Sequence, residues 1–231
     1  MRILLTRPEA DGERTAARLE SLGHEVLRGP VLEIVPTRTP VPDAPFDALI
    51  ATSAHAFLDL QGAITHLRSL PIHVAGMRTA VAAKRAGFDH PGIVARDARD
   101  LATAILAQTP SAARFLYLTA LDRRPDIESR LAAAGHDVTP CITYEASAVG
   151  NLPLDVIEAL RQGTVDAVLH FSPRSAELYL ALARRAGFLD EALRPLQVAI
   201  SDAAAESLRP TATRLAVARA PDLDAMIACL P

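Results

Sequence analysis

Small hydroxyl residues and arginines recur in this 231-residue chain where a short apolar run gives way to a helical segment. We interpret the apolar runs as parallel strands, whose carboxyl ends meet at one edge of a sheet and commonly bind a ligand there. Hydroxyl groups and free amides at helix N-termini bind anions, and arginine binds a carboxylate through two parallel hydrogen bonds. The predicted anion-binding residues are Arg7, Thr52, Ser53, Gly76, Thr79, Arg124, Ser172, Arg174 and Ser201.

Each of these Ser and Thr residues, taken alone, has an alternative role as a helix N-cap. The set recurs in both halves of the chain, which favours the lining of a cleft for a large polyanionic ligand. Tyr144 stands apart from the set, in Ile142-Thr143-Tyr144-Glu145, on a segment that we expect to connect two domains. A phenol there can donate a proton or a hydrogen bond to a leaving oxygen. Its alternative role is packing at a domain junction.

Several kinds of chemistry lack their sequence signature. The chain has no Gly-x-Gly-x-x-Gly, no Gly-x-x-x-x-Gly-Lys-Ser/Thr and no Gly-x-Ser-x-Gly, which argues against dinucleotide binding, a P-loop and a nucleophile elbow. The seven histidines lack metal-ligand spacing, and the two cysteines, Cys141 and Cys229, are far apart. The acidic residues form no evident acid–base pair. We therefore predict a protein that uses no metal and no cofactor.

The charge and the hydropathy of the chain argue against several classes of binding partner. The formal net charge is −3 and there is no basic block, which argues against nucleic acid. No apolar run approaches the roughly 18 residues of a membrane span, and the N-terminal run is too short for a signal peptide. Two isolated thiols suit a reducing compartment, so we expect a cytoplasmic protein that binds no membrane.

The composition and the periodicity indicate the fold class. Half of the residues are hydrophobic but only 4% are aromatic, so Ala, Leu, Val and Ile must form most of the core. Continuous apolar runs alternate with helical segments such as 10–22 and 175–186, the pattern of a doubly wound parallel sheet. Glycine follows four of the predicted helices, where it can take the left-handed conformation. The predicted strands are 2–6, 25–28, 48–51, 73–75, 92–94, 115–118, 137–141, 167–171, 198–200 and 215–217.

The chain also contains an internal repeat. Residues 18–26, Arg-Leu-Glu-Ser-Leu-Gly-His-Glu-Val, recur 112 positions later as Arg-Leu-Ala-Ala-Ala-Gly-His-Asp-Val at 130–138. Further matches follow in the same order at slowly drifting offsets, which indicates a duplication. They are 3–6 with 116–119, 47–53 with 166–172, and Asp100-Leu101 with Asp222-Leu223, each of the last pair opening a predicted helix.

The order of the repeats indicates how the copies are connected. Residues 1–28 supply one strand–helix–strand unit, but only three strands follow the corresponding unit at 114–139. We therefore predict an α/β protein of two flavodoxin-like parallel-sheet domains, one inserted into the other. Domain 1 would comprise 1–35 plus 149–231 and domain 2 would comprise 38–145, with the crossings Pro30–Pro36 and Pro140–Ala146 pairing as a two-strand hinge. The alternative is a head-to-tail split near residue 110.

Seven short motifs, spread along nearly the whole chain, are similar to those of a known protein family. They are Leu5-Thr6-Arg7-Pro8, Leu22-Gly23-His24-Glu25-Val26, Pro30-Val31-Leu32-Glu33-Ile34, Ala51-Thr52-Ser53-Ala54, Val74-Ala75-Gly76-Met77-Arg78-Thr79-Ala80, Ile142-Thr143-Tyr144-Glu145 and Phe171-Ser172-Pro173-Arg174-Ser175. In order and spacing the chain resembles the uroporphyrinogen-III synthase family. The resemblance implies the inserted two-domain fold and an activity: cyclisation of the linear tetrapyrrole hydroxymethylbilane, with inversion of its D ring, to uroporphyrinogen III.

The resemblance also implies roles for individual residues. Tyr144 matches the tyrosine proposed in the family to assist departure of the hydroxyl group. The positions that match the lining of the family's cleft are Thr52, Ser53, Thr79 and Ser172.

One segment departs from the family pattern. Ile200-Ser201-Asp202-Ala203-Ala204 stands where the family usually has a Gly-Pro-x-Thr-Ala-like turn. Asp202 would place a negative charge near an anionic substrate, unless it caps the following helix, which is the role we expect. The departure leaves open a diverged, non-catalytic regulatory module that binds tetrapyrroles or small anions on the same fold.

Two further alternatives are a periplasmic-type binding protein, which would need an export signal, and a flavin-binding protein, which the scarcity of aromatic residues disfavours. For the synthase, the expected partners are hydroxymethylbilane as substrate and a transient contact with hydroxymethylbilane synthase. The expected oligomeric state is a monomer.

Overall fold

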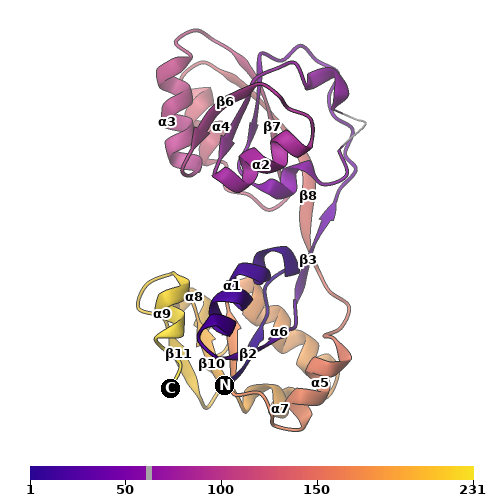
Figure 1. Cartoon of the computed structure of the whole chain (residues 1–231), viewed down its shortest axis with the longest axis vertical. Helices are drawn as coiled ribbons and strands as arrows, with labels where there is room; N and C mark the ends of the chain where they lie inside the picture. The colour runs from indigo at the N-terminus through magenta and orange to yellow at the C-terminus, as the bar shows by residue number, and fades with distance from the viewer. Residues whose placement is uncertain (61–63) are drawn as a thin grey trace. The chain divides into compact units, whose positions relative to one another are not determined.

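The computed structural model describes residues 1–60 and 64–231. The chain divides into two compact units, each with helices packed on a sheet (Figure 1). Domain 1 comprises Met1–Glu33 and Ser147–Pro231, and domain 2 comprises Ile34–Ala146, so the second is inserted into the first. Within the described ranges, no helix has the length and apolar content needed to cross a membrane.

Domain 1 contains a five-stranded parallel sheet in the order β11-β10-β9-β1-β2. Ile3, Leu5 and Leu169 on its central strands are buried against Leu19 of α1 and Met226 of α9. Leu4, between Ile3 and Leu5, is buried too, and such continuous burial is expected where helices cover both faces of a parallel sheet. The strands are β1 (Arg2–Leu5), β2 (Glu25–Arg28), β9 (Ala167–His170), β10 (Leu196–Ala199) and β11 (Leu215–Val217). The helices are α1 (Glu9–Ser21), α5 (Leu154–Arg161), α6 (Pro173–Arg185), α7 (Leu189–Leu193), α8 (Asp202–Ala205) and α9 (Leu223–Ile227).

Domain 2 contains the parallel order β8-β7-β4-β5-β6, with β3 added outside β8. Alternate residues of each strand enter different clusters: Leu116 and Leu118 pack on one face of the sheet, Phe115 and Tyr117 on the other. The strands are β3 (Leu32–Pro36), β4 (Ala48–Ala51), β5 (Ile72–Ala75), β6 (Pro91–Ala95), β7 (Arg114–Ala120) and β8 (Asp137–Ala148). The helices are α2 (Met77–Arg85), α3 (Ala98–Gln108) and α4 (Asp126–Ala133), with short 3-10 helices η1 (Ala54–Phe57) and η2 (Thr65–Leu67).

The two sheets have the same topology. Strand by strand, β6-β5-β4-β7-β8 in domain 2 corresponds to β11-β10-β9-β1-β2 in domain 1. In each sheet, an aspartate before the third strand accepts a hydrogen bond from the first amide of the fourth. Asp166 Oδ2 accepts from Arg2 N at 2.7 Å, and Asp47 Oδ2 accepts from Arg114 N at 2.8 Å. The sequence repeat therefore corresponds to a repeated architecture.

The repeated Gly-His segment ends α1 and α4. Gly23 (φ +82°) and Gly135 (φ +89°) adopt the left-handed conformation, and the amide of the following histidine donates back to the last turn of the helix. Gly87 and Gly187 also have positive φ, so all four predicted glycine ends are confirmed.

Two expectations about connections are corrected. The head-to-tail alternative is excluded, because β1 lies between β2 and β9 in one sheet. The match of Asp100 with Asp222 is wrong as a structural equivalence. Asp222 caps α9, whereas Asp97 caps α3 and Asp100 lies within its first turn. The equivalent N-cap residues are therefore Asp97 and Asp222, so the spacing between the two repeats differs here from that of the sequence match.

The predicted antiparallel pairing of the two crossings is confirmed, although the strand count and the strand bounds differ. Pro30–Pro36 contributes an eleventh strand, β3, to the described residues, where ten were expected. The second crossing is the continuation of β8, whose residues as far as Tyr144 still pair with β7. Backbone hydrogen bonds from Thr37 N to Thr143 O, and from Val149 N to Val31 O, show that β3 and β8 run antiparallel.

Candidate functional site

Four of the predicted site residues lie beyond the carboxyl ends of β1, β9 and β10, which are adjacent in the domain 1 sheet. Arg7 follows β1, Ser172 and Arg174 follow β9, and Ser201 follows β10. The Thr6 hydroxyl donates to Leu169 O at 2.8 Å, which ties the ends of the two central strands together. The structure thus brings these four residues to one edge of domain 1.

Arg7 is held by an aromatic ring that the sequence analysis did not single out. Its guanidinium carbon lies 4.6 Å from the centroid of Phe171, and its Nη1 donates to Thr15 Oγ1 at 3.4 Å. A guanidinium over an aromatic face is attracted by the electron density of the ring. Phe171 therefore helps to orient Arg7. Its signal in the sequence was an aromatic residue directly before Ser172.

The two serines of domain 1 are helix N-caps, the alternative role that the sequence allowed. Ser172 Oγ accepts from Ser175 N at 3.1 Å in a capping box, and Ser201 Oγ accepts from Ala204 N at 3.3 Å. The expectation that Asp202 caps α8 is wrong, because Ser201 already occupies that position. Asp202 is exposed and forms an ion pair with Arg209, seven residues further along the chain and beyond the end of α8.

The edge of domain 2 carries the remaining predicted residues. The hydroxyls of Thr52, after β4, and Tyr117, on β7, are hydrogen-bonded at 2.9 Å. Ser53 caps η1 by accepting from His55 N at 3.2 Å. Arg124 lies beyond β7, is exposed, and has no ion-pair partner in the part of the chain that the structure describes.

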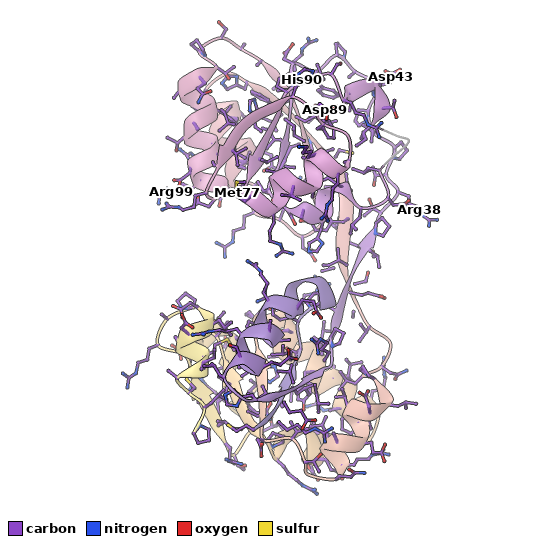
Figure 2. All side chains as sticks on the ribbon, viewed as in Figure 1. Arg38, Asp43, Met77, Asp89, His90 and Arg99 are labelled. Atoms are coloured by element: carbon purple, nitrogen blue, oxygen red, sulfur yellow. The ribbon has the colours of Figure 1, made fainter. Side chains whose placement is uncertain are left out.

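Gly76 and Thr79 lie at the start of α2, where we expected a free amide and a hydroxyl to bind an anion. The structure does not offer either group to a ligand. Gly76 has φ +84°, a conformation that favours glycine, but its amide donates to Ala95 O at 2.8 Å and so is not free to bind an anion. The Thr79 side chain is buried. Met77, between them, is 70% exposed (Figure 2).

A groove within domain 2 adjoins this helix start. Its volume is about 520 Å³, and it lies between η1 and α2. Apolar side chains line most of it, and two arginines add positive charge. The principal lining residues are Phe57, Leu58, Met77, Arg78, Val81 and Arg85.

Tyr144 lies on β8 opposite Ala120 of β7, and its carbonyl accepts from Leu121 N at 3.0 Å. Its half-buried ring packs against the hydrophobic cluster beneath η1 and lies 5.7 Å from the imidazole of His55. Tyr144, Thr52 and Ser53 therefore belong to one side of domain 2. His55 was missed by the sequence analysis, although it follows Thr52-Ser53 by two positions.

His170, the last residue of β9, does not reach the sheet edge at which a ligand would bind. It is completely buried, and its Nε2 is 2.9 Å from Gln197 Oε1. Burial lowers the pKa of His170 to about 4, so the imidazole is neutral at neutral pH. Within residues 1–60 and 64–231, no group of three His, Cys, Asp or Glu side chains is arranged to hold a metal ion.

A comparison with known protein families identifies the family to which this two-domain fold belongs. The family model described as uroporphyrinogen-III synthase HemD matches residues 13–228. The chain belongs to this family. Membership accounts for the inserted second domain and for the matched sheet topologies. It also implies that the substrate is a small molecule, a tetrapyrrole.

Solved structures show the same fold. A uroporphyrinogen-III synthetase from Helicobacter pylori is 19% identical with a TM-score of 0.63, over 99% of this chain and 97% of that one. A mutant uroporphyrinogen III synthase from Thermus thermophilus is 22% identical with a TM-score of 0.51, over 99% and 96%. No curated protein matches the sequence.

Proposed function

We propose that this chain is a uroporphyrinogen-III synthase, a lyase that cyclises hydroxymethylbilane with inversion of its D ring. The observation that carries the proposal is the family match over residues 13–228. The chemistry of the two domain edges supports it. The bilane carries eight carboxylates on apolar pyrrole rings, and the described edges offer arginines and hydroxyls beside exposed apolar side chains.

In the proposed reaction, the terminal hydroxyl of the bilane leaves as water after it accepts a proton. The remaining azafulvene is electron-poor, and the D ring attacks it through its own substituted carbon to form a spiro intermediate. Fragmentation and reclosure then join the ring in the inverted orientation. Closure without inversion can occur unaided, so the protein acts mainly by holding the chain folded for the spiro route.

Tyr144 is the proposed proton donor to the departing hydroxyl. Tyr144 is half-buried at the edge of domain 2, where its ring is supported by the hydrophobic cluster of that domain. For the substrate carboxylates we propose Arg7, Arg174 and Arg124, which lie beyond the carboxyl ends of β1, β9 and β7. Thr52 and Ser53 would line the edge of domain 2, and Ser172 and Ser201 the edge of domain 1. Thr79, which is buried, would support the start of α2 from within, where Gly76 allows close approach of the substrate.

The test is an isomer assay. Hydroxymethylbilane is generated fresh and mixed with the protein, the products are oxidised, and the type I and type III porphyrins are separated. We expect an excess of type III over the enzyme-free control. Type I alone would contradict the proposal and favour the diverged binding module, for which the altered turn at Ser201–Ala204 and the exposed Asp202 are the specific observations.

We further propose that the protein acts as a cytoplasmic monomer and meets hydroxymethylbilane synthase transiently when it receives its substrate. Sedimentation velocity of the isolated protein tests the first point, and a stable dimer would contradict it. Mixing the two proteins in the same experiment tests the second. The expected result is a weak association that raises the mean sedimentation coefficient only at high concentration.

A further inference from the structure

Two rings meet at the edge of the domain 2 sheet. The imidazole of His55, on η1, and the phenol ring of Tyr144, on β8, have centroids 5.7 Å apart and planes inclined by 54°. Both side chains are half-buried. Tilted rings at this distance attract each other, because the positive edge of one approaches the negative face of the other. The contact therefore restrains the orientation of the phenol.

A bulge in β8 directs Tyr144 toward η1. In the pairing of β8 with β7, Thr143 is an extra residue between Ile142 and Tyr144. In a regular strand Cys141 and Tyr144, three positions apart, would face opposite sides of the sheet. Because of the extra residue, both pack against the cluster that contains Ala56 of η1. Bulges re-aim side chains in this way beside functional sites.

The backbone that carries His55 is fixed on both sides. Ser53 accepts a hydrogen bond from His55 N, and the preceding Thr52 is bonded through its hydroxyl to Tyr117. Ala56, which follows, is completely buried. The imidazole therefore projects from a rigid segment, and a side chain on such a segment can hold its neighbour in a defined orientation.

We propose that His55 is a positioning residue for Tyr144, and that its ring holds the phenol in the orientation from which the hydroxyl reaches the leaving oxygen. This role rests on the function proposed above. His55 contacts no reacting atom in this scheme. Its removal therefore takes away one restraint on the orientation of the phenol and lowers kcat, while the contacts that bind the substrate, and hence KM, stay the same.

The test is a double-mutant cycle of His55→Ala and Tyr144→Phe, with kcat and KM measured on hydroxymethylbilane. We expect His55→Ala to lower kcat about 3- to 10-fold at unchanged KM, the size expected for one aromatic contact. In the Tyr144→Phe protein, which lacks the phenolic hydroxyl, His55→Ala should have no further effect on kcat. His55→Phe keeps a ring and should restore kcat in the otherwise wild-type chain.

The matched control is His66→Ala, which removes an exposed histidine from the other 3-10 helix of domain 2 and should leave kcat and Tm unchanged. A second readout is independent of activity. The chain has no Trp and three Tyr, so its near-ultraviolet emission comes from tyrosine. His55→Ala should change this emission in the wild-type background and leave it unchanged in Tyr144→Phe. If His55→Ala fails to fold, His55→Asn takes its place in the cycle.

The outcomes separate this role from the proposed function. Equal kcat losses in the two backgrounds, or a raised KM, would overturn the positioning role, while a type III excess from the wild-type protein would keep the function. Absence of that excess would overturn the function and the catalytic purpose of the contact together. The emission comparison would then still decide whether His55 holds the Tyr144 ring.

Discussion

The two domains share a sheet topology and differ where their strands end. After β9, domain 1 continues into the 13-residue α6, whereas after β4, domain 2 continues into the four-residue η1. In the repeated segments Phe171 of domain 1 corresponds to Thr52 of domain 2. The first supports Arg7, and the second is hydrogen-bonded to Tyr117. The duplication thus kept the capping serines, Ser53 and Ser172, but changed the residue before each of them, which carries no ladder hydrogen bond and can acquire a separate role.

The interiors differ as well, at the last residue of the central strand. His170 in domain 1 corresponds to Ala51 in domain 2, and both are completely buried. Domain 1 therefore encloses a titratable ring bonded to Gln197, where domain 2 has only a methyl group. His73 of domain 2 is only partly buried, and desolvation lowers its pKa as well. The deeper burial of His170 therefore makes the stability of domain 1 the more sensitive to acid.

The largest expected effect tests whether the catalytic group belongs to domain 2 alone. Tyr144→Phe should lower turnover about 100- to 10 000-fold, roughly 3–5 kcal/mol in activation free energy, because the proposed proton donor is lost. The fold should be unaltered by circular dichroism. The matched control in domain 1 is Tyr179→Phe, which removes a buried hydrogen bond to Ala192 O. It should lower stability by about 1 kcal/mol and leave turnover unchanged. Unchanged turnover in Tyr144→Phe would remove Tyr144 from the mechanism.

The next prediction concerns the pH dependence of domain 1. The folded pKa of His170, about 4, is below its ordinary value near 6.5. Between these values an unfolded chain binds a proton that the folded chain does not. Stability from this group is therefore complete above about pH 6.5 and is lost as the pH falls to about 4, by on the order of 3 kcal/mol. Hydrogen exchange should show β9 opening more readily on acidification than β4.

His170→Gln sharpens that comparison. Glutamine does not titrate in this range, and its amide can still hydrogen-bond with Gln197. The variant should remove the excess acid sensitivity of β9 and leave the exchange of β4 as it was. An equal acid response of the two strands in the wild-type protein would show that the buried histidine does not control domain 1.

A smaller effect is expected from the aromatic support of Arg7. Phe171→Leu keeps an apolar side chain but removes the ring beneath the guanidinium, so Arg7 is less well ordered for a carboxylate. The KM for hydroxymethylbilane should rise about 3- to 5-fold, corresponding to roughly 1 kcal/mol, with little change in kcat. Steady-state kinetics on the folded variant check this. An unchanged KM would mean that Arg7 does not bind the substrate.

The smallest expected effect is a difference in thermal stability between variants of the two equivalent aspartates, Asp47 and Asp166. Arg114 holds the pKa of Asp47 below its usual value through a side-chain hydrogen bond as well as its amide, whereas the amide of Arg2 is bound by Asp166. Asp47→Asn should lower Tm by less than about 3 °C, and Asp166→Asn by less still, since exposed charge pairs contribute little. Calorimetry checks the order. The contribution of Asp47 should be present above its ordinary pKa and fade as the pH falls through the lowered one.

Much of the fold was predictable because its signals are local. The apolar runs predicted all ten strands of the two parallel sheets, and β2, β4 and β11 match their predicted bounds. The four helix ends at glycine were predictable for the same reason. The second crossing was also expected to be extended, but as a segment beginning at Pro140 rather than as part of the same strand as 137–141. Pairing with β7 keeps the strand extended through that proline.

The candidate site was predictable by residue type and less so by contact. Ser172 and Ser53 were placed correctly at strand ends, yet both also cap helices, and local sequence does not distinguish the two roles. Phe171 and His55 were missed because each acts on a partner distant in sequence. Only folding brings Phe171 under Arg7 and His55 beside Tyr144.

The sequence by itself determined the α/β class, the duplication, the insertion of one domain into the other and the family resemblance. These depend on periodicity and order along the chain, which need no knowledge of distant contacts. The tertiary structure decided which hydroxyls are used as caps, that Ser201 rather than Asp202 caps α8, and that His170 is buried. It also decided which ring supports Arg7 and which supports Tyr144. The physical reason is that hydrogen bonds, ring contacts and desolvation depend on distance in space, and one extra residue in β8 is enough to change the face on which Tyr144 lies.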